Sequence, residues 1–212
     1  RMTTRVCHSK SIVELGNRYE AANKEYKKDI WQYTTMPEVS RKLRLELEER
    51  LNLLTEEANN SPFNDIEWND KRVGIIANGI AYQYSREAFG EEASYLRLGF
   101  SYPIPMKLIK EFASQVDSLY VIEEVEPYLE EQIRAAGIAC QGRNLLPGIG
   151  ELSPKIIEEA IKGVRNEVLP MQPEKVTKRP PVLCAGCAHR AVFYELSKRK
   201  DLFISGDIGC RL

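Results

Sequence analysis

The feature that most constrains the fold of this 212-residue chain is an alternation of short apolar runs with amphipathic stretches between Lys71 and Cys140. The runs RVGIIAN, SYLRLGF and SLYVIEEV predict strands, IAC predicts a fourth brief strand, and IAYQYSREAFG, KLIKEFASQV and YLEEQIRAAG predict helices. Parallel strands need crossover connections, which such helices supply. The alternation therefore predicts the α/β fold class, with a mostly parallel sheet and helices on both faces.

An N-terminal helical segment is predicted before this region, within residues 1–67. SIVELGNRYEAANKEYKKD and SRKLRLELEERLNLLTEEAN carry strong helix formers with charges at i, i+4 spacing. Ser40, after Pro37, is the expected N-cap of the second helix. That helix has an apolar stripe for packing onto a neighbouring domain or for a coiled-coil partner, formed by Leu43, Leu47, Leu51 and Leu54. NNSPFNDIEWND then predicts turns.

The stretch 143–182 is predicted to be a connector. It holds one helix capped by Ser153 and a proline-broken linker, LPMQPEKVTKRPP. In the last segment, 183–212, AVFYELSKRK predicts a helix and DLFISGD a strand, which together make half of a βαβ unit that cannot bury itself alone. Because the chain starts at Arg1 and stops beside a cysteine motif, we expect it to be a piece of a longer protein.

Composition excludes several classes of protein. A net charge of −1 argues against a nucleic-acid-binding module, which needs a clustered basic surplus. No apolar run approaches the roughly 20 residues of a membrane span, and nothing at the start resembles a signal peptide. Five unevenly spaced cysteines argue against a disulfide framework. We therefore expect a cytoplasmic protein with reduced thiols.

The cysteines near the end leave several chemistries open. Cys184 and Cys187 have the spacing of two metal ligands on one turn, and His189 and Cys210 would complete a zinc site. An iron–sulfur site would be short of ligands, and the adjacent Arg190 disfavours a nearby dication. A thioredoxin-like redox pair requires a strand before the pair, where the sequence has KRPPVL. Idle thiols in a loop are the fourth interpretation.

The sequence GDIG, after the apolar run LFIS, indicates a binding crevice. Gly206, Asp207 and Gly209 would lie at the carboxyl end of a strand, where α/β folds bind ligands, and glycines let a backbone approach a ligand closely. Cys184, Cys187 and Cys210 would then face the same crevice.

The carboxylates of VIEEVEP also follow a predicted strand. Glu123 and Glu124 could do proton chemistry, but no nucleophile or histidine lies nearby in the sequence. We expect them to cap the next helix or to bind a cation of a neighbouring domain. ANGIAY has a single glycine and does not match the dinucleotide-binding fingerprint.

RPPVLCAGCAHRAVFYEL followed by SGDIGC resembles the start of the diphosphate-binding domain in the alpha subunit of indolepyruvate:ferredoxin oxidoreductases, in the 2-oxoacid:ferredoxin oxidoreductase family. TTRVCHSKS resembles the exit from the family's pyrimidine-binding domain, and RVGIIANGIAYQYSREA through SLYVIEEVEPYLEEQIRAAGI resembles its transketolase C-terminal-like domain. LLPGIGELSP is similar to the connector that follows. The resemblance implies a helical connector at 1–67, a transketolase C-terminal-like domain at 68–142, a helix and linker at 143–182, and a truncated diphosphate-binding domain at 183–212.

This resemblance implies a thiamine diphosphate enzyme that oxidatively decarboxylates indolepyruvate and other arylpyruvates to aryl-acetyl-CoA. Ferredoxin would accept the electrons, and a beta subunit, coenzyme A and the arylpyruvate would be the other partners. The implied cofactor-binding residues are Cys184, Cys187, His189, Arg190, Gly206, Asp207, Gly209 and Cys210, with no catalytic residue among them. Mg²⁺ and [4Fe-4S] clusters would be bound by parts absent from this chain, so we expect the chain alone to be inactive.

A hypothesis of a different class is a non-catalytic α/β binding or interaction module. Its cysteine-rich tail would then be incidental or would hold a metal. Metal content distinguishes the two, because the metal-holding module predicts stoichiometric zinc or iron in the pure protein, whereas the oxidoreductase piece predicts none.

Overall fold

The computed structural model describes residues 12–22, 25–163, 183 and 186–205. The chain divides into two units, Arg1–Asn166 and Glu167–Leu212. The first contains the sheet and the helices that cover it, and the second contains a single described helix, α8 (Ala188–Lys198).

The first unit is built on a four-stranded sheet with the strand order β1-β3-β2-β4. Strands β2 (Val73–Asn78), β3 (Ser94–Leu98) and β4 (Ser118–Ile122) are parallel, with β2 in the middle. Strand β1 (Asn64–Glu67) pairs antiparallel with β3 at the edge of the sheet. The predicted mostly parallel sheet is confirmed.

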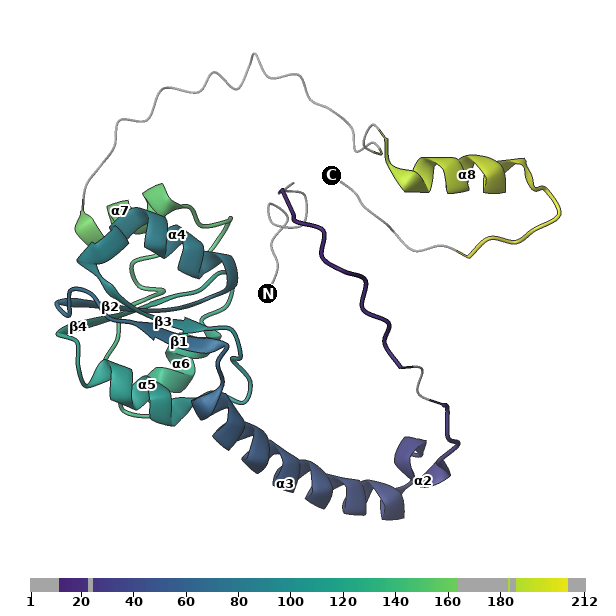
Figure 1. Cartoon of the computed structure of the whole chain (residues 1–212), viewed down its shortest axis with the longest axis horizontal. Coiled ribbons are helices and arrows are strands. Elements are labelled where there is room, and N and C mark those ends of the chain that lie inside the picture. The colour runs from purple at the N-terminus through teal and green to yellow at the C-terminus, as the bar shows by residue number, and fades with distance from the viewer. Residues whose placement is uncertain (1–11, 23–24, 164–182, 184–185, 206–212) are drawn as a thin grey trace. The chain divides into compact units, whose positions relative to one another are not determined.

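Helices cover both faces of this sheet (Figure 1). One face carries α4 (Gly79–Phe89), which continues into the 3₁₀ turn η1 (Gly90–Glu92), and α7 (Pro154–Lys162). The other face carries α5 (Met106–Ala113) and α6 (Tyr128–Ala135). Each parallel crossover therefore carries a helix, as the α/β alternation in the sequence predicts.

Two apolar cores lie on the two sides of the sheet, because successive strand residues point to opposite faces. Ile75 is buried under α4 and Ile76 is buried on the opposite side, and neither is exposed. The α4–α7 core also contains Ala77, Ala81, Phe89, Tyr95, Ile122, Leu146, Leu152 and Ile157. The α5–α6 core also contains Leu96, Leu98, Ile109, Phe112, Leu119, Val121, Leu129 and Ile133.

Helix α3 (Pro37–Asn60) precedes the sheet, and the short helix α2 (Ile30–Tyr33) precedes α3. The N-cap of α3 is Met36, so the prediction of Ser40 at this position is wrong. Pro37 occupies the first helical position, where a missing N–H costs nothing, and the helix therefore starts earlier than predicted. The leucine stripe is half-buried, at Leu43, Leu47, Leu51 and Leu54.

Three further predictions of local structure are wrong. Residues 12–22 and 25–29 are not helical. A short segment that is rich in helix-forming residues is rarely stable as a helix unless one of its faces packs against other parts of the protein. The turns predicted after α3 are confirmed only at Pro62 and Phe63, because the next four residues form strand β1, which pairs with β3. IAC forms no strand, and only Gln141, just after it, makes an isolated parallel bridge, to Tyr120.

Helix α8 of the second unit confirms most of the predicted helical stretch AVFYELSKRK, but it begins three residues earlier, at Ala188, and ends at Lys198. The predicted strand DLFISGD is not found in its described part, because Asp201–Ser205 has no neighbouring strand there with which to pair. None of the helices in the described ranges combines the length and the hydropathy needed to cross a bilayer.

Candidate functional site

Part of the predicted cofactor site lies within the described residues, at the start of α8. Gly186 has a φ of 76°, a left-handed conformation that glycine adopts without strain. Cys187 occupies the N-cap position, and its Sγ lies 3.5 Å from Nδ1 of His189. Cys187 is half-buried, whereas His189 and Arg190 are exposed. The turn thus brings a thiol and an imidazole together at the beginning of an 11-residue helix.

The chemistry of this helix start suits an anion. The first backbone N–H groups of α8 receive no side-chain cap, and the amino end of a helix carries a partial positive charge. Arg190 adds a guanidinium in the first turn. Cys184, Gly206, Asp207, Gly209 and Cys210 lie outside the described residues. Within the described part of the chain, no group of three or more His, Cys, Asp or Glu side chains could hold a metal ion.

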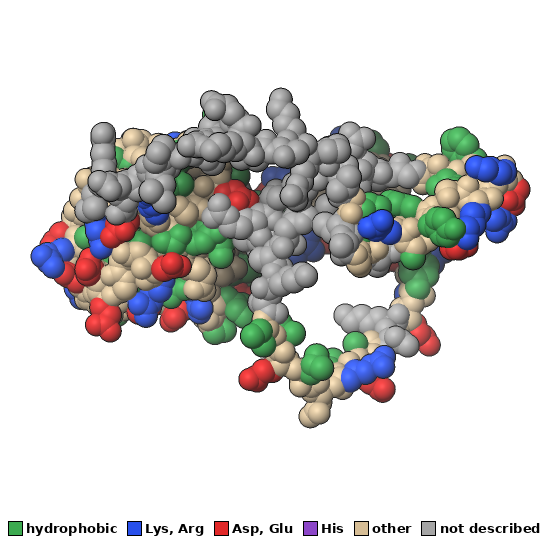
Figure 2. Space-filling model, turned by 90° about the horizontal axis from the view of Figure 1, so that it is seen from above, with side chains coloured by type: hydrophobic (Ala, Val, Ile, Leu, Met, Phe, Trp, Pro, Cys, Tyr) green, Lys and Arg blue, Asp and Glu red, His purple; other side chains and the backbone are tan. Residues whose placement is uncertain are grey.

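Apolar side chains are exposed next to this helix start. Val192, Phe193 and Tyr194 on α8 are each more than half exposed, and Phe203 is 97% exposed. Figure 2 shows apolar side chains in green beside basic ones in blue on this part of the chain. The described residues of the second unit therefore do not bury a core among themselves.

The carboxyl ends of β2 and β4 form the place where a doubly wound sheet usually binds its ligand, because the connections from these strands leave on opposite faces. The hollow here has a volume of only about 10 Å³, room for about one water molecule at most. It is lined by Asn78, Ile80, Ala81, Glu123 and Glu124. A larger hollow, of about 530 Å³, lies beside α2 and α3 and contains none of the residues discussed as a site.

The carboxylate of Glu123 caps helix α6. Its Oε2 accepts from the backbone N–H of Leu129 and its Oε1 from that of Glu130, both at 3.0 Å. The residue at the N-cap position is Pro127, whose side chain makes no hydrogen bond, so Glu123 supplies the missing acceptor. The sequence-based prediction of a capping role is confirmed for Glu123.

The carboxylate of Glu124 holds the loop between Arg143 and Leu152. Its Oε1 accepts from the backbone N–H of Leu152 at 3.0 Å, and Glu124 is only 8% exposed. Arg143 ties the same loop to the end of β4 by donating to the carbonyls of Val125 (2.6 Å) and Gly148 (3.0 Å). The loop between Arg143 and Leu152 is therefore fixed to the residues that follow β4.

Sequence reasoning missed a backbone distortion at this edge of the sheet. Val125 has a φ of 70°, a left-handed value that a β-branched side chain rarely adopts. Its carbonyl accepts from Arg143, which stabilises the turn. No signal in the residues VIEEVEP indicates this conformation, because it depends on contacts with a loop some 20 residues later.

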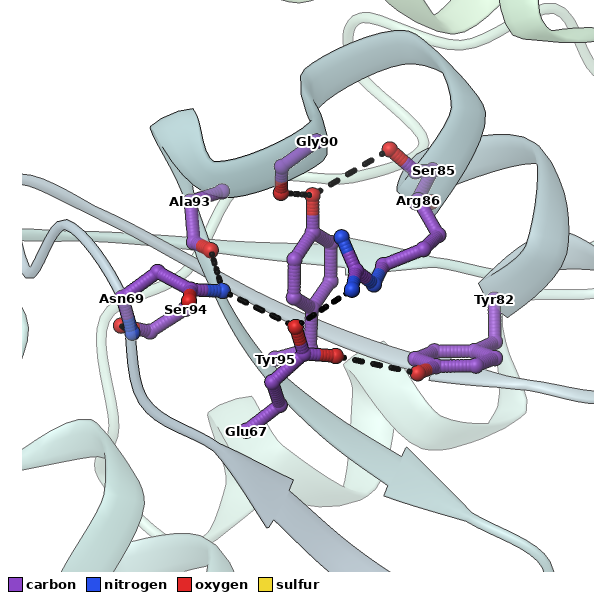
Figure 3. Close-up of polar contacts among 9 residues, drawn as sticks. All are labelled: Glu67, Asn69, Tyr82, Ser85, Arg86, Gly90, Ala93, Ser94 and Tyr95. Atoms are coloured by element: carbon purple, nitrogen blue, oxygen red, sulfur yellow. Dashed lines mark hydrogen bonds and ion pairs between the residues drawn. The ribbon is translucent and has the colours of Figure 1, made fainter.

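A polar network connects β1, α4 and β3 (Figure 3). Arg86 forms an ion pair with Glu67 (2.8 Å), and the hydroxyl of Tyr82 donates to the other oxygen of Glu67 (3.3 Å). The hydroxyl of fully buried Tyr95 donates to the carbonyl of Gly90 at 2.8 Å. Burial raises the pKa of Tyr95 well above its ordinary value. These polar groups are engaged in holding α4 on the sheet.

No protein-family model matches the chain. Among curated proteins, the indolepyruvate oxidoreductase subunit IorA of Methanothermobacter thermautotrophicus is 35% identical over 239 residues, and that of Methanothermobacter marburgensis is 33% identical over 235 residues. The IorA subunit of Archaeoglobus fulgidus is 33% identical over 236 residues. Each comparison covers 99% of this chain but only 37–38% of the relative, so the chain spans less than two-fifths of their length.

One solved structure, 2-oxoglutarate:ferredoxin oxidoreductase from Magnetococcus marinus with 2-oxoglutarate, coenzyme A and succinyl-CoA bound, is 20% identical to the chain, with a TM-score of 0.47. The match covers 61% of this chain and 24% of that protein.

Proposed function

We propose that this chain, which is homologous to indolepyruvate oxidoreductase subunits IorA along almost its whole length, is the middle part of a thiamine diphosphate-dependent 2-oxoacid:ferredoxin oxidoreductase subunit. Its reaction would be the oxidative decarboxylation of indolepyruvate and other arylpyruvates to aryl-acetyl-CoA. The observation that carries the proposal is an identity of 31–35% extending over 99% of the chain in six curated relatives.

In this proposal the parts of the chain have separate roles. Residues 1–67 would be the helical connector that follows a pyrimidine-binding domain, and residues 68–142 would form a transketolase C-terminal-like domain. Residues 143–182 would link this domain to the diphosphate-binding domain, which would begin with residues 183–212. The beta subunit, ferredoxin, coenzyme A and the arylpyruvate are the proposed partners, and the cytoplasm is the proposed location. Mg²⁺ and the [4Fe-4S] clusters would be held by parts outside this chain, which by itself would be inactive.

The sheet would act as a scaffold in this enzyme. Glu123 caps α6, and Glu124 holds the loop between Arg143 and Leu152. Glu130, which is 3% exposed, accepts from the backbone N–H of Arg143 at 2.7 Å and pairs with Arg134. These carboxylates are therefore engaged in structural hydrogen bonds, and the crevice between them has no room for a substrate. Chemistry would take place beside the cysteine segment instead.

The residues at the start of α8 suit the cofactor. Arg190 and the uncapped N–H groups of α8 would bind a diphosphate, and Cys187 and His189 would line the pocket, together with Cys184, Gly206, Asp207, Gly209 and Cys210. The bound cofactor would supply the electron sink that accepts the charge left by decarboxylation. The chain's own residues would orient it and exclude water.

The test uses the complete subunit together with its partner subunit. Arg190→Ala is expected to weaken the affinity for thiamine diphosphate at least tenfold, about 1.4 kcal/mol, because a charge-assisted contact is lost. The affinity is measured by titrating thiamine diphosphate while following the indolepyruvate- and coenzyme A-dependent reduction of a viologen dye. The rate at saturating thiamine diphosphate should change much less.

Lys198→Ala is the matched control, since Lys198 lies at the other end of the same helix, where it pairs with Glu195 and lies over the ring of Tyr194. Equal affinities of both variants and of the parent protein would contradict the role of Arg190. Failure of the complete enzyme to oxidise any arylpyruvate would contradict the proposed reaction. Stoichiometric zinc or iron in the isolated chain would favour the metal-holding module instead.

A further inference from the structure

The last turn of α3 is attached to the sheet domain by the side chain of Asn59. Its Oδ1 accepts from the backbone N–H groups of Lys107 (3.1 Å) and Leu108 (3.2 Å), at the second and third positions of α5. The N-cap residue of α5 is Pro105, which makes no side-chain cap. Asn59 therefore caps α5 from a different helix, 48 residues earlier in the chain.

Asn64 makes a second attachment of the same kind. Its Nδ2 donates to the carbonyl of Ala58 in α3 at 2.8 Å and to that of Phe100, after β3, at 2.9 Å. Its Oδ1 accepts from the backbone N–H of Phe100 at 2.8 Å, and the residue is only 9% exposed. One buried amide thus joins the end of α3 to the loop at the carboxyl end of β3.

The backbone at this junction is too closely packed to slide. The N–H of Gly99 donates to the carbonyl of Phe63 at 3.0 Å, and a Cβ at Gly99 would lie 2.6 Å from the same oxygen. Only glycine therefore fits at this position. The junction has little side-chain packing to support it, because among the residues of α3 only Val39 and Ala58 are buried.

We propose that Asn59 and Asn64 form a latch that fixes the direction of α3 relative to the sheet. They act as positioning residues, and α3 is a rigid arm because its orientation is set by directional hydrogen bonds at one end. The importance of this latch for catalysis rests on the proposed function, in which α3 lies between two domains of the enzyme. The latch itself is a property of this chain and can be tested without any activity.

The first measurement is amide hydrogen exchange, by NMR, at Lys107 and Leu108 in the isolated chain. Asn59→Ala is expected to raise their exchange rates at least tenfold, because both N–H groups lose their acceptor. The matched control is Asn60→Ala. Asn60 is the next residue, is exposed, and its side chain donates to the carbonyl of Glu56 within α3, so its removal should change these rates less than twofold.

The direction of the arm is measured by electron–electron spin distances. Labels at Arg41 in α3 and Lys110 in α5, both exposed, are placed in a background that lacks the five native cysteines. The parent chain and Asn60→Ala should give one narrow distance distribution. Asn59→Ala and Asn64→Ala should give a broad distribution, with the double variant the broadest.

Conservative substitutions separate the latch from a general loss of stability. Asn59→Asp keeps the acceptor that α5 uses and places a charge that is favourable at the start of α5 but unfavourable at the end of α3. It loses only the Nδ2 donor to the carbonyl of Thr55 within α3, which is not part of the attachment, so the distribution should stay narrow. Asn64→Asp removes the donor used by two carbonyls and should not keep it narrow. Should Asn64→Ala fail to fold, the Asn59 series still decides the question, because that side chain is only half-buried.

A distance distribution that stays narrow in Asn59→Ala, or exchange rates that match those of Asn60→Ala, would overturn the latch. In the complete enzyme, Asn59→Ala should lower kcat several-fold without changing the affinity for thiamine diphosphate, and Asn59→Asp should recover it. A broad distribution together with unchanged turnover would leave the latch in place and remove its link to catalysis.

Discussion

Replacing Tyr95 by phenylalanine should change both the stability of the first unit and its dependence on pH. At neutral pH the substitution removes the hydroxyl that donates to the carbonyl of Gly90 at 2.8 Å. The second contact of this hydroxyl, to the carbonyl of Ser85, is 3.5 Å long and therefore weak. One good hydrogen bond is therefore lost, at a cost of about 1 kcal/mol. The ring keeps its place, because its edge-to-face contact with Tyr82, at 5.9 Å, does not involve the hydroxyl.

At alkaline pH the sign reverses. Burial raises the pKa of Tyr95 in the folded chain, whereas the unfolded side chain titrates near its ordinary value of about 10. Above that pH the unfolded state loses the proton and the folded state keeps it, so stability falls by up to about 1.4 kcal/mol per pH unit. Tyr95→Phe lacks this loss. The two stability curves should therefore meet near pH 11, within about one unit above the unfolded pKa.

The assay is urea unfolding between pH 8 and 11.5, followed by the fluorescence of Trp68, which stacks on Phe112 at a ring distance of 5.2 Å. Trp31→Phe serves as the background, since the chain has two tryptophans. The control is Tyr19→Phe, at a residue that is 87% exposed, which should match the background at every pH. A stability difference between Tyr95→Phe and its background that stays constant over this pH range would refute the reasoning.

Two substitutions test the packing and capping of the first unit by urea unfolding. Gly74→Ala should cost about 1–3 kcal/mol, because its Cβ would lie 2.6–2.9 Å from the side chain of Val116. The free-energy cost of Gly74→Ala should be smaller in a Val116→Gly background. Gly16→Ala, at a position with nothing within 4 Å, should cost nothing. An equal cost of Gly74→Ala with Val116 and with Gly at position 116 would contradict this contact. Glu123→Ala should cost about 1–2 kcal/mol through the lost cap of α6, and Glu123→Gln about half as much, because one amide oxygen remains as an acceptor. Equal stability of the two Glu123 variants would contradict the capping role.

Local signals in the sequence were sufficient for much of the first unit. Strand β2 has a buried apolar run, as expected of a strand covered on both faces, and Ser153 caps α7 by accepting from the N–H of Ile156 at 3.3 Å. Both features depend on residues adjacent in the chain. The same holds at the candidate site, where Cys187 and His189 meet because they are two residues apart.

Features that depend on distant partners could not be predicted. β1 has the sequence NDIE, too short and polar to read as a strand, and it forms because it can pair with β3. The cap that Asn59 gives to α5 spans 48 residues and has no local signature. The prediction of a helix before residue 29 was wrong because the local signal was present but a packing partner was not: the described residues of this segment are exposed and bury no face against the rest of the chain.

The attachment of α3 has a consequence for where this molecule can be cut. Excision at residue 68, the limit suggested by the sequence, would delete the edge strand β1 and both latch asparagines, leaving the amino end of α5 without its acceptor. A piece that folds autonomously should therefore begin no later than the last two turns of α3. The unit that folds cooperatively thus begins inside helix α3, upstream of residue 68, where the resemblance in sequence places the start of the domain.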